Sequence, residues 1–154
     1  MTVRVAGLGD APAVAALRRT WTEENHGAPI EDDAFDAVFA EWFEREHDQR
    51  VTWLAEVEGL AVGMLNLLVF TRMPRPRTPD APASPDAWGY VANVYVGPAH
   101  RDACAGRWLL DAATSHADEH GFARLVLSPS PRSVPCYERA GFATATSLML
   151  RPGR

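Results

Sequence analysis

Residues 94–110 read VYVGPAHRDACAGRWLL and lead from an apolar strand, through a turn, into a helix. Gly97-Pro98 ends the strand, and the helix then begins among small residues. The free amides of a helix start attract anions, and small side chains let a phosphate come close to the backbone. Arg101 and Arg107 add positive charge on both sides of that start. From the residues alone, the segment predicts either a phosphate site or an ordinary strand-to-helix turn with solvated arginines.

Hydrophobic periodicity predicts the elements around this segment. Before it we expect a strand at 3–5, helices over 10–26 and 33–47, a hairpin of strands 51–57 and 60–70 with a bulge at Gly63, and a strand over 88–96. After it we expect a helix over 104–120 capped by Gly121, a strand over 125–127, a short helix between Ser133 and Gly141, and a last strand over 142–150. This order predicts an α/β or α+β fold with helices on both faces of the sheet.

Length and composition predict one domain over residues 1–154. The chain is 47% hydrophobic, enough for a core, yet it lacks the roughly 18 consecutive apolar residues of a membrane helix. Its first residues lack the pattern of a secretory signal. Two cysteines make no disulfide framework, which favours a cytoplasmic location without membrane association.

The charged residues exclude several classes of function. All 15 basic residues are arginines, so lysine Schiff-base chemistry, lysine-anchored pyridoxal phosphate and a phosphate-loop lysine are excluded. A net charge of −5 argues against nucleic-acid binding, which depends on neutralising phosphates.

A second segment, residues 136–142, reads CYERAGF and follows the expected strand 125–127. Together the two segments resemble the GCN5-related N-acetyltransferase (GNAT) family. Arg101-x-x-Cys104-x-Gly106 is similar to the family's Arg/Gln-x-x-Gly-x-Gly/Ala phosphate loop, and Tyr137-x-x-x-Gly141-Phe142 to its later tyrosine motif. The resemblance covers nearly the whole chain. It implies a GNAT-type mixed, mostly antiparallel twisted sheet that splays between the fourth and fifth strands.

The resemblance also implies a cofactor and a reaction. Acetyl-CoA would be the co-substrate, without a metal, and the acetyl group would pass by direct attack to a primary amine of a small molecule or a peptide. Tyr137 would be the general acid, and Asn93 would orient the acceptor or a water molecule. The implied acetyl-CoA-binding residues are Val94, Tyr95, Val96, Arg101, Asp102, Ala103, Cys104, Ala105, Gly106, Arg107 and Ser130. Cys104 stands where the family has glycine and Ser130 where it often has asparagine, so reduced affinity is expected.

The general base is left open. The strand 88–96 offers no carboxylate, so Asp86 and His26 are the candidates, unless an amine of low pKa needs no base. Ten of the 20 acidic residues lie between Glu23 and Asp48. They predict either a negative rim that attracts cationic amines or a solvated polar helix face.

Two other functions, acyl-CoA binding without catalysis and zinc binding, are also considered, and a role is expected for one long loop. The missing strand carboxylate and Cys104 also suit a non-catalytic acyl-CoA-binding or sensor module, which Tyr137 opposes. His116 to His120 matches the His-x-x-Glu-His zinc pattern, but a third ligand is scarce, so no metal is expected. The proline-rich loop 72–85 is expected to shape the acceptor pocket or to form a contact in a homodimer.

Overall fold

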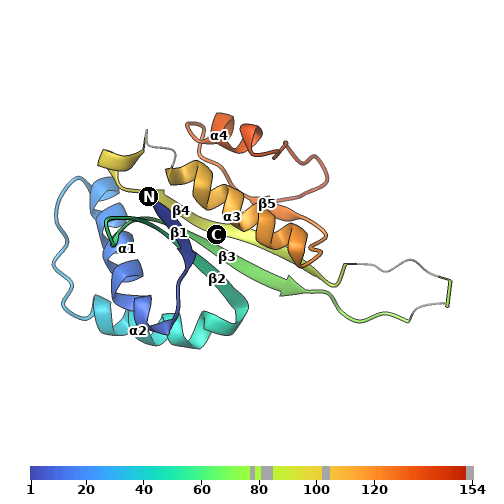
Figure 1. Cartoon of the computed structure of the whole chain (residues 1–154), viewed down its shortest axis with the longest axis horizontal. Helices are drawn as coiled ribbons and strands as arrows, with labels where there is room; N and C mark the ends of the chain where they lie inside the picture. Colours follow the sequence, from blue (N-terminus) through green and yellow to red (C-terminus); the bar gives the residue numbers. More distant parts are fainter. Residues whose placement is uncertain (77–78, 81–84, 102–104, 152–154) are drawn as a thin grey trace.

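A computed structural model describes residues 1–76, 79–80, 85–101 and 105–151 of the chain (Figure 1). In these residues five strands form one sheet in the order of the chain. Neighbouring strands are antiparallel, except that the last two are parallel. The strands are β1 (Thr2–Val5), β2 (Arg50–Val57), β3 (Leu60–Thr71), β4 (Ala87–Val96) and β5 (Leu125–Leu127).

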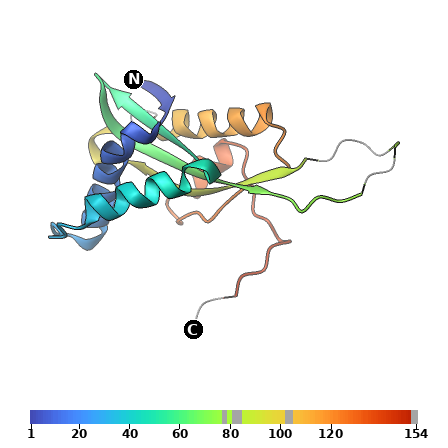
Figure 2. The ribbon, with the colours of Figure 1, turned by 90° about the horizontal axis from the view of Figure 1, so that it is seen from below.

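Helices cover both faces of the sheet (Figure 2). The helices are α1 (Ala11–His26), α2 (Phe35–Glu46), α3 (Ala105–Glu119) and α4 (Val134–Arg139). On one face, α1 and α2 pack on Leu54, Met64 and Tyr95. On the other, α3 buries Leu109 and Leu110 against β2, β3 and β4, and α4 packs beside this second cluster. The predicted fold class, with helices on both faces, is therefore confirmed.

The β2–β3 hairpin forms where the sequence predicts it. Its turn residues, Glu58 and Gly59, have φ angles of 51° and 81°, the left-handed pair that matches the natural twist of a two-residue hairpin. The pairing register shifts after Ala55 and leaves Val62 without a partner in β2. The predicted bulge is thus confirmed to within one residue of Gly63.

A second bulge bends β4 where it leaves β5. Asn66 of β3 pairs with Asn93, but Leu67 pairs with Val91, so Ala92 is the extra residue. β5 pairs with β4 only at Gly89, Tyr90 and Val91. Because a bulge increases the local twist, β4 turns away from β5 from Ala92 onward. This is the splay that the resemblance implies.

One local prediction is wrong, and two polar residues that precede helices do not cap them. Residues 142–151 form no strand, because the apolar residues of this segment are consecutive at 148–150 and offer no single face for burial. Asp10 precedes α1, yet its carboxylate accepts from the Gly7 amide and from Arg4 instead of capping the helix. Ser133 precedes α4, but its hydroxyl donates to the carbonyl of Ser130.

The described residues of the β3–β4 connection, 72–76, 79–80 and 85–86, extend beyond the end of the sheet (Figures 1 and 2). The connection leaves from Thr71 and returns at Ala87, at the opposite end of β4 from Val96. The expectation that it shapes the acceptor pocket or a dimer contact stays a prediction. No helix in the described part of the chain is long and apolar enough to cross a membrane.

Candidate acetyl-CoA site

The free half of β4 offers backbone groups at the splay. From Asn93 to Val96 the strand pairs with β3 but has no partner in β5. Val94 and Val96 lie in this half, as the sequence predicts for residues that would pair with a pantetheine arm. The Val96 carbonyl already accepts a hydrogen bond from Arg101 Nε at 3.0 Å. The Val94 backbone has no such side-chain contact with the described residues.

Tyr95 turns its side chain to the opposite face. It is 4% exposed, and its ring stacks on Trp21 of α1 with centroids 5.6 Å apart. Its hydroxyl donates to Glu24 Oε2 at 3.1 Å. Tyr95 could therefore contact a cofactor only through its backbone.

The turn after β4 leads through a short 3-10 helix (Pro98–His100) to Arg101 and on to α3. Asp102, Ala103 and Cys104 lie outside the described residues. Ala105 is fully buried and anchors the start of α3 in the core. A side chain added at Gly106 would meet nothing closer than Val96 Cγ2 at 3.8 Å. Packing within the described protein therefore does not require glycine there, whereas a ligand close to the backbone would.

The two arginines of this segment are paired within the protein. Arg101 Nη2 donates to both carboxylate oxygens of Glu24, at 2.7 and 2.6 Å, and this contact lowers the pKa of Glu24. Arg107 Nε donates to Asp111, one turn along α3, at 2.8 Å. The arginines supply positive charge at the turn, and each also holds a neighbouring carboxylate.

Tyr137 on α4 has the features of a proton donor. Its ring packs edge-to-face on Phe142 at 5.8 Å, and its hydroxyl makes no hydrogen bond with the described residues. Burial raises the pKa of Tyr137, so the phenol stays protonated at neutral pH. It lines a cavity of about 420 Å³ that runs along β5, beside α4 and residues 142–148.

Ser130 and Asn93 differ in how free their side chains are. The Ser130 hydroxyl lies 3.0 Å from that of Ser133, so the serines share a hydrogen bond. Asn93 is half-buried on the same sheet face as α1 and α2, and its amide makes no hydrogen bond with the described residues. It lies opposite Asn66, whose amide is engaged by Thr52 and Arg50.

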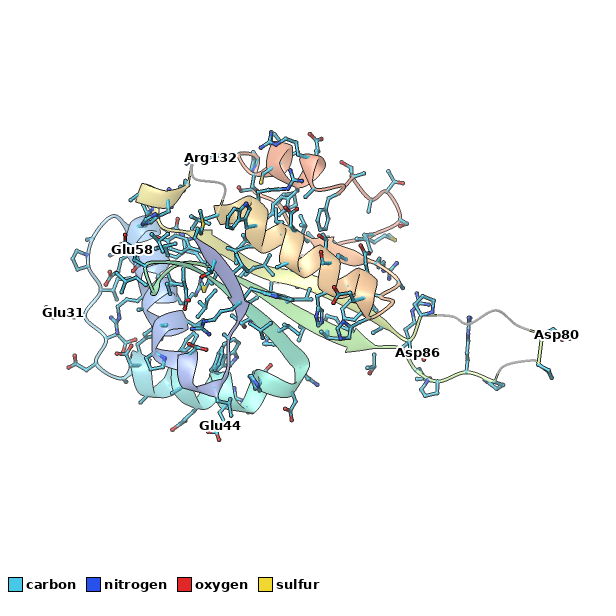
Figure 3. All side chains as sticks on the ribbon, in the orientation of Figure 1. Glu31, Glu44, Glu58, Asp80, Asp86 and Arg132 are labelled. Atoms are coloured by element: carbon cyan, nitrogen blue, oxygen red, sulfur yellow. The ribbon has the colours of Figure 1, made fainter. Side chains whose placement is uncertain are left out.

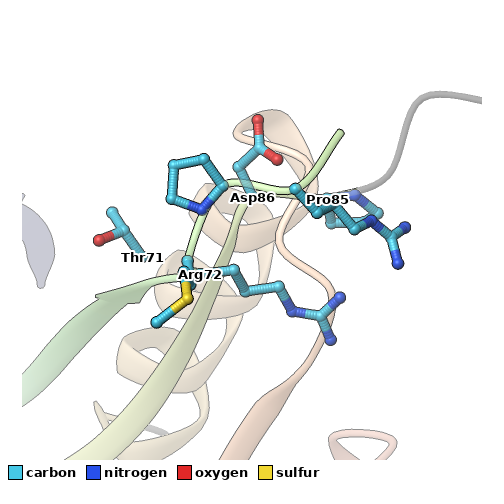
Figure 4. Close-up of a pocket in the computed structure, with 7 residues that line it drawn as sticks. Thr71, Arg72, Pro85 and Asp86 are labelled. Atoms are coloured by element: carbon cyan, nitrogen blue, oxygen red, sulfur yellow. The ribbon is translucent and has the colours of Figure 1, made fainter. Parts of the chain in front are cut away.

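The structure separates the two candidate bases. Asp86 lies at the start of β4, at a cavity of about 330 Å³ beside Pro85 and Arg72 (Figure 4). Val94 is eight residues further along the strand, roughly 25 Å away at 3.3 Å per residue. His26 is the last residue of α1 and is exposed. Among them, His26 belongs to the end of the molecule that holds Glu24 and Arg101.

The acidic segment is largely solvated or paired. Glu31 and Glu44 point outward from the α1–α2 side (Figure 3), while Glu23 accepts from the Ile30 amide and Glu46 from Arg50. This favours the solvated-face interpretation over a negative rim. On α3, the His116 and His120 rings lie 4.0 Å apart, and the described residues hold no group of three or more metal-ligating side chains.

Glu24 is a residue that the sequence interpretation missed. It joins Arg101 to Tyr95 across 77 and 71 positions of the chain. A signal was present, because Val14, Leu17, Trp21 and Glu24 share the spacing of the buried face of α1. A carboxylate at the edge of an apolar helix face is a candidate for an ion pair, but this spacing does not identify Arg101 as its partner.

Comparisons with known proteins agree with this geometry. The chain is similar to a GCN5-related N-acetyltransferase from Ralstonia eutropha JMP134, with 26% identity over 98% of this chain and 97% of that one, and a TM-score of 0.71. A protein from Clostridium acetobutylicum, described as a predicted acetyltransferase and solved with acetyl-CoA, shares 20% identity over 98% and 95%, with a TM-score of 0.72. Glucosamine-6-phosphate N-acetyltransferase from Arabidopsis thaliana shares 16% identity over 98% and 97%, with a TM-score of 0.72.

The search among curated proteins returned no match. The model of the acetyltransferase (GNAT) family matches residues 14–142, from α1 to the residue after Gly141. That range contains β2 to β5, the turn before α3, and Tyr137. The chain therefore belongs to the GNAT family of acetyltransferases.

Proposed function

We propose that this protein transfers an acetyl group from acetyl-CoA to a primary amine of a small molecule or a peptide. The observation that carries the proposal is the half of β4 that has no partner in β5, together with a helix start that leaves room at Gly106 and with Tyr137, whose hydroxyl makes no hydrogen bond with the described residues. Acetyl-CoA would supply a thioester carbonyl carbon to the acceptor.

Different parts of the chain would bind different parts of acetyl-CoA. Backbone groups near Val94 would pair with the pantetheine arm, and an amide there would polarise the carbonyl oxygen. The first turn of α3, at Ala105 and Gly106, would face the diphosphate with its free amides. Arg101 and Arg107 would add positive charge beside it.

Tyr137 would protonate the leaving thiolate, and solvent would take the proton of the acceptor amine. As the carbon–sulfur bond breaks, Tyr137 would donate its hydroxyl proton to the departing thiolate. Asn93 would hold the acceptor nitrogen or a water molecule, because an amide can orient but cannot remove a proton. β4 carries no acid, so the acceptor would enter as the free amine or lose its proton to water.

The test is release of CoA thiol with a panel of amines, comparing the wild type with Tyr137→Phe. We expect the variant to lose about 10²- to 10⁴-fold in kcat, the usual contribution of a positioned general acid. Its Kd for acetyl-CoA, measured by calorimetry, should stay unchanged. The raised pKa of Tyr137 predicts that kcat falls only when the pH rises above the ordinary tyrosine pKa of about 10.

Tyr90→Phe is the matched control, because it removes a phenol hydroxyl from β4 without touching α4. Equal kcat values for wild type and Tyr137→Phe would exclude Tyr137 as the acid. If acetyl-CoA binds but no amine is acetylated, the protein is instead a non-catalytic acyl-CoA-binding module. The absence of a carboxylate from β4 is the observation that favours that second function.

A further inference from the structure

A carboxylate of α1 holds the arginine that opens the turn before α3. Glu24 Oε1 and Oε2 accept from Arg101 Nη2 at 2.7 and 2.6 Å. Arg101 Nε donates to the Val96 carbonyl at 3.0 Å. Two of the three guanidinium nitrogens are thus bonded within the protein, one to α1 and one to the end of β4.

The carboxylate is itself fixed by the core. Tyr95 donates to Glu24 Oε2 at 3.1 Å, and its ring lies 5.8 Å from the guanidinium carbon of Arg101. Tyr95 is buried and stacks on Trp21, so the hydroxyl that donates to Glu24 is held by the core. The cluster of Trp21, Glu24, Tyr95 and Arg101 therefore ties α1, β4 and the turn into one unit.

Two arginines act on the one carboxylate of Glu24. Glu24 offsets Arg101, and the charge of Arg132, on the turn before α4, also acts on Glu24 and lowers its pKa. Figure 3 shows Arg132 next to α4, above the 3-10 helix that precedes Arg101. The two arginines therefore leave one positive charge that Glu24 does not offset.

We propose that Glu24 is a positioning residue for acetyl-CoA binding: by holding Arg101, it fixes the turn whose backbone leads into the anion-binding start of α3. The inference rests on the proposed function, because it names a residue that serves the same site. A turn that is held in place before the ligand arrives loses less conformational entropy when the ligand binds. Glu24 would thus raise affinity without touching the ligand.

The opposite role, in which Glu24 competes with the ligand for Arg101, predicts that Kd changes in the opposite direction when Glu24 is removed. If Glu24 merely competed with phosphates for Arg101, its removal would free the arginine and tighten binding. We expect the reverse, because Arg101 Nε would remain on Val96 while the outer end of the side chain lost its anchor. The prediction is a weaker, not a stronger, complex.

The first experiment is calorimetric titration of acetyl-CoA into Glu24→Ala and Glu24→Gln. We expect Kd to rise about tenfold for Glu24→Ala, as for the loss of one charge-assisted hydrogen bond, and less for Glu24→Gln, which can still accept from Tyr95. KM for acetyl-CoA should rise in parallel while kcat at saturation is retained. Glu44→Gln removes the same charge from the outer side of α2 and should leave Kd unchanged (Figure 3).

A double-mutant cycle tests whether Glu24 acts through Arg101. In an Arg101→Ala background, Glu24→Ala should add no further loss, because the two residues would serve one function. Losses that add, an unchanged Kd, or tighter binding by Glu24→Ala would each overturn the proposal. A general loss of fold would show as a lower Tm in Glu24→Ala and a change in kcat as well as KM.

Hydrogen exchange of the protein without ligand separates this inference from the proposed function. Glu24→Gln should speed amide exchange over residues 97–107, and Glu44→Gln should not. Unchanged exchange would overturn the anchoring role even if acetyl-CoA binds normally. If the wild type itself fails to bind acetyl-CoA, the proposed function falls, and faster exchange in Glu24→Gln would show an anchor that serves another ligand.

Discussion

Among single residues, the buried polar pair of Thr52 and Asn66 has the clearest energetic consequence. Each is 4% exposed. Asn66 Nδ2 donates to Thr52 Oγ1 at 2.7 Å, and its Oδ1 accepts from Arg50 at 2.8 Å. The described residues leave no buried side-chain polar atom without a partner. Polar groups at these positions are therefore stable only as a connected set.

Asn66→Leu should lower the free energy of unfolding by about 1–3 kcal/mol, because it leaves the Thr52 hydroxyl buried without its donor. Adding Thr52→Val should restore part of the loss, since replacing both partners by apolar groups removes the unsatisfied atom. Urea unfolding of the two single variants and the double variant measures this. Thr22→Val, on the exposed side of α1, is the control, with an expected change within about 0.5 kcal/mol. Fully additive losses would contradict the pairing argument.

Asp10 gives a prediction for the pH dependence of stability. The Arg4 guanidinium, 2.7 Å away, holds the pKa of Asp10 at about 2, below its ordinary value of 3.8. A carboxyl group with a depressed pKa stabilises the fold above its unfolded pKa, and this contribution is lost as the pH falls through the folded value. Asp10→Asn should therefore be less stable than wild type at pH 7, and the gap should close between about pH 4 and pH 2.

Thermal unfolding of both proteins across that pH range measures the gap. Asp36→Asn is a matched control, because Asp36 is exposed and its contact with Arg19 is 3.7 Å long. A gap between wild type and Asp10→Asn that stays constant down to pH 2 would show that the Arg4 contact does not carry the effect. Solvent screens such surface pairs, so the difference in Tm will be small but its pH trend is diagnostic.

Residue identities alone were enough to propose part of a site. Tyr137 and the segment 94–107 could be proposed because their local motifs are short and continuous, and their roles, like that of Asn93, stay predictions. Glu24 was missed because its partners, Tyr95 and Arg101, are more than 70 positions away, and only the fold brings them together. The hydrogen bonds that commit Ser130 to Ser133 and Arg107 to Asp111 are likewise absent from any residue-type pattern.

At the scale of elements, the pairing of β4 with β5 depends on Gly89. A Cβ at this position would lie 2.7 Å from Leu125 Cδ2 of β5 and 2.8 Å from Leu67 Cδ1 of β3. Real Cβ atoms do not approach carbon atoms so closely, so both leucines would have to move. Leu67 is fully buried and has little room. Gly89 thus allows the short parallel contact that ends at the splay.

Gly89→Ala should lower the free energy of unfolding by about 1–3 kcal/mol, the usual cost of overpacking a core. Chemical denaturation gives the value. Gly9→Ala is the control, since a Cβ at Gly9 meets nothing within 4 Å and the change should stay within about 0.5 kcal/mol. If both variants were equally stable, β5 would be held by α3 and α4 and not by its contact with β4.

Periodicity predicted most elements because their apolar faces are regular. The stripe of Phe35, Phe39 and Trp42 predicted the helix α2, and the alternation in β2 predicted a strand. The prediction failed at residues 142–150, where alanine, threonine and serine alternate without burying a face. It also missed the bulge at Ala92, because a bulge depends on the register of a neighbouring strand and not on the residues of one strand alone.

At the scale of the whole molecule, β4 has a long pairing with β3 on one side and a short pairing with β5 on the other. The strands β1 to β4 are joined by long antiparallel pairings and by helices on both faces. The segment from β5 to α4 is joined to the sheet by three parallel pairs, and none of the residues of α4 is fully buried. A ligand bound between β4 and β5 would add contacts where the sheet has its shortest pairing.

Acetyl-CoA at about 100 times its Kd should therefore stabilise the protein by about 2.7 kcal/mol, which corresponds to a rise in Tm of about 5–10 °C for a chain of this size. Thermal unfolding with and without ligand measures the shift. Acetyl-pantetheine at the same concentration is the control, because it keeps the thioester but lacks the diphosphate. We expect it to give a much smaller shift, since on the proposed function the start of α3 and its arginines would bind the phosphates. Equal shifts from the two compounds would show that the binding energy comes from β4 and not from the turn before α3.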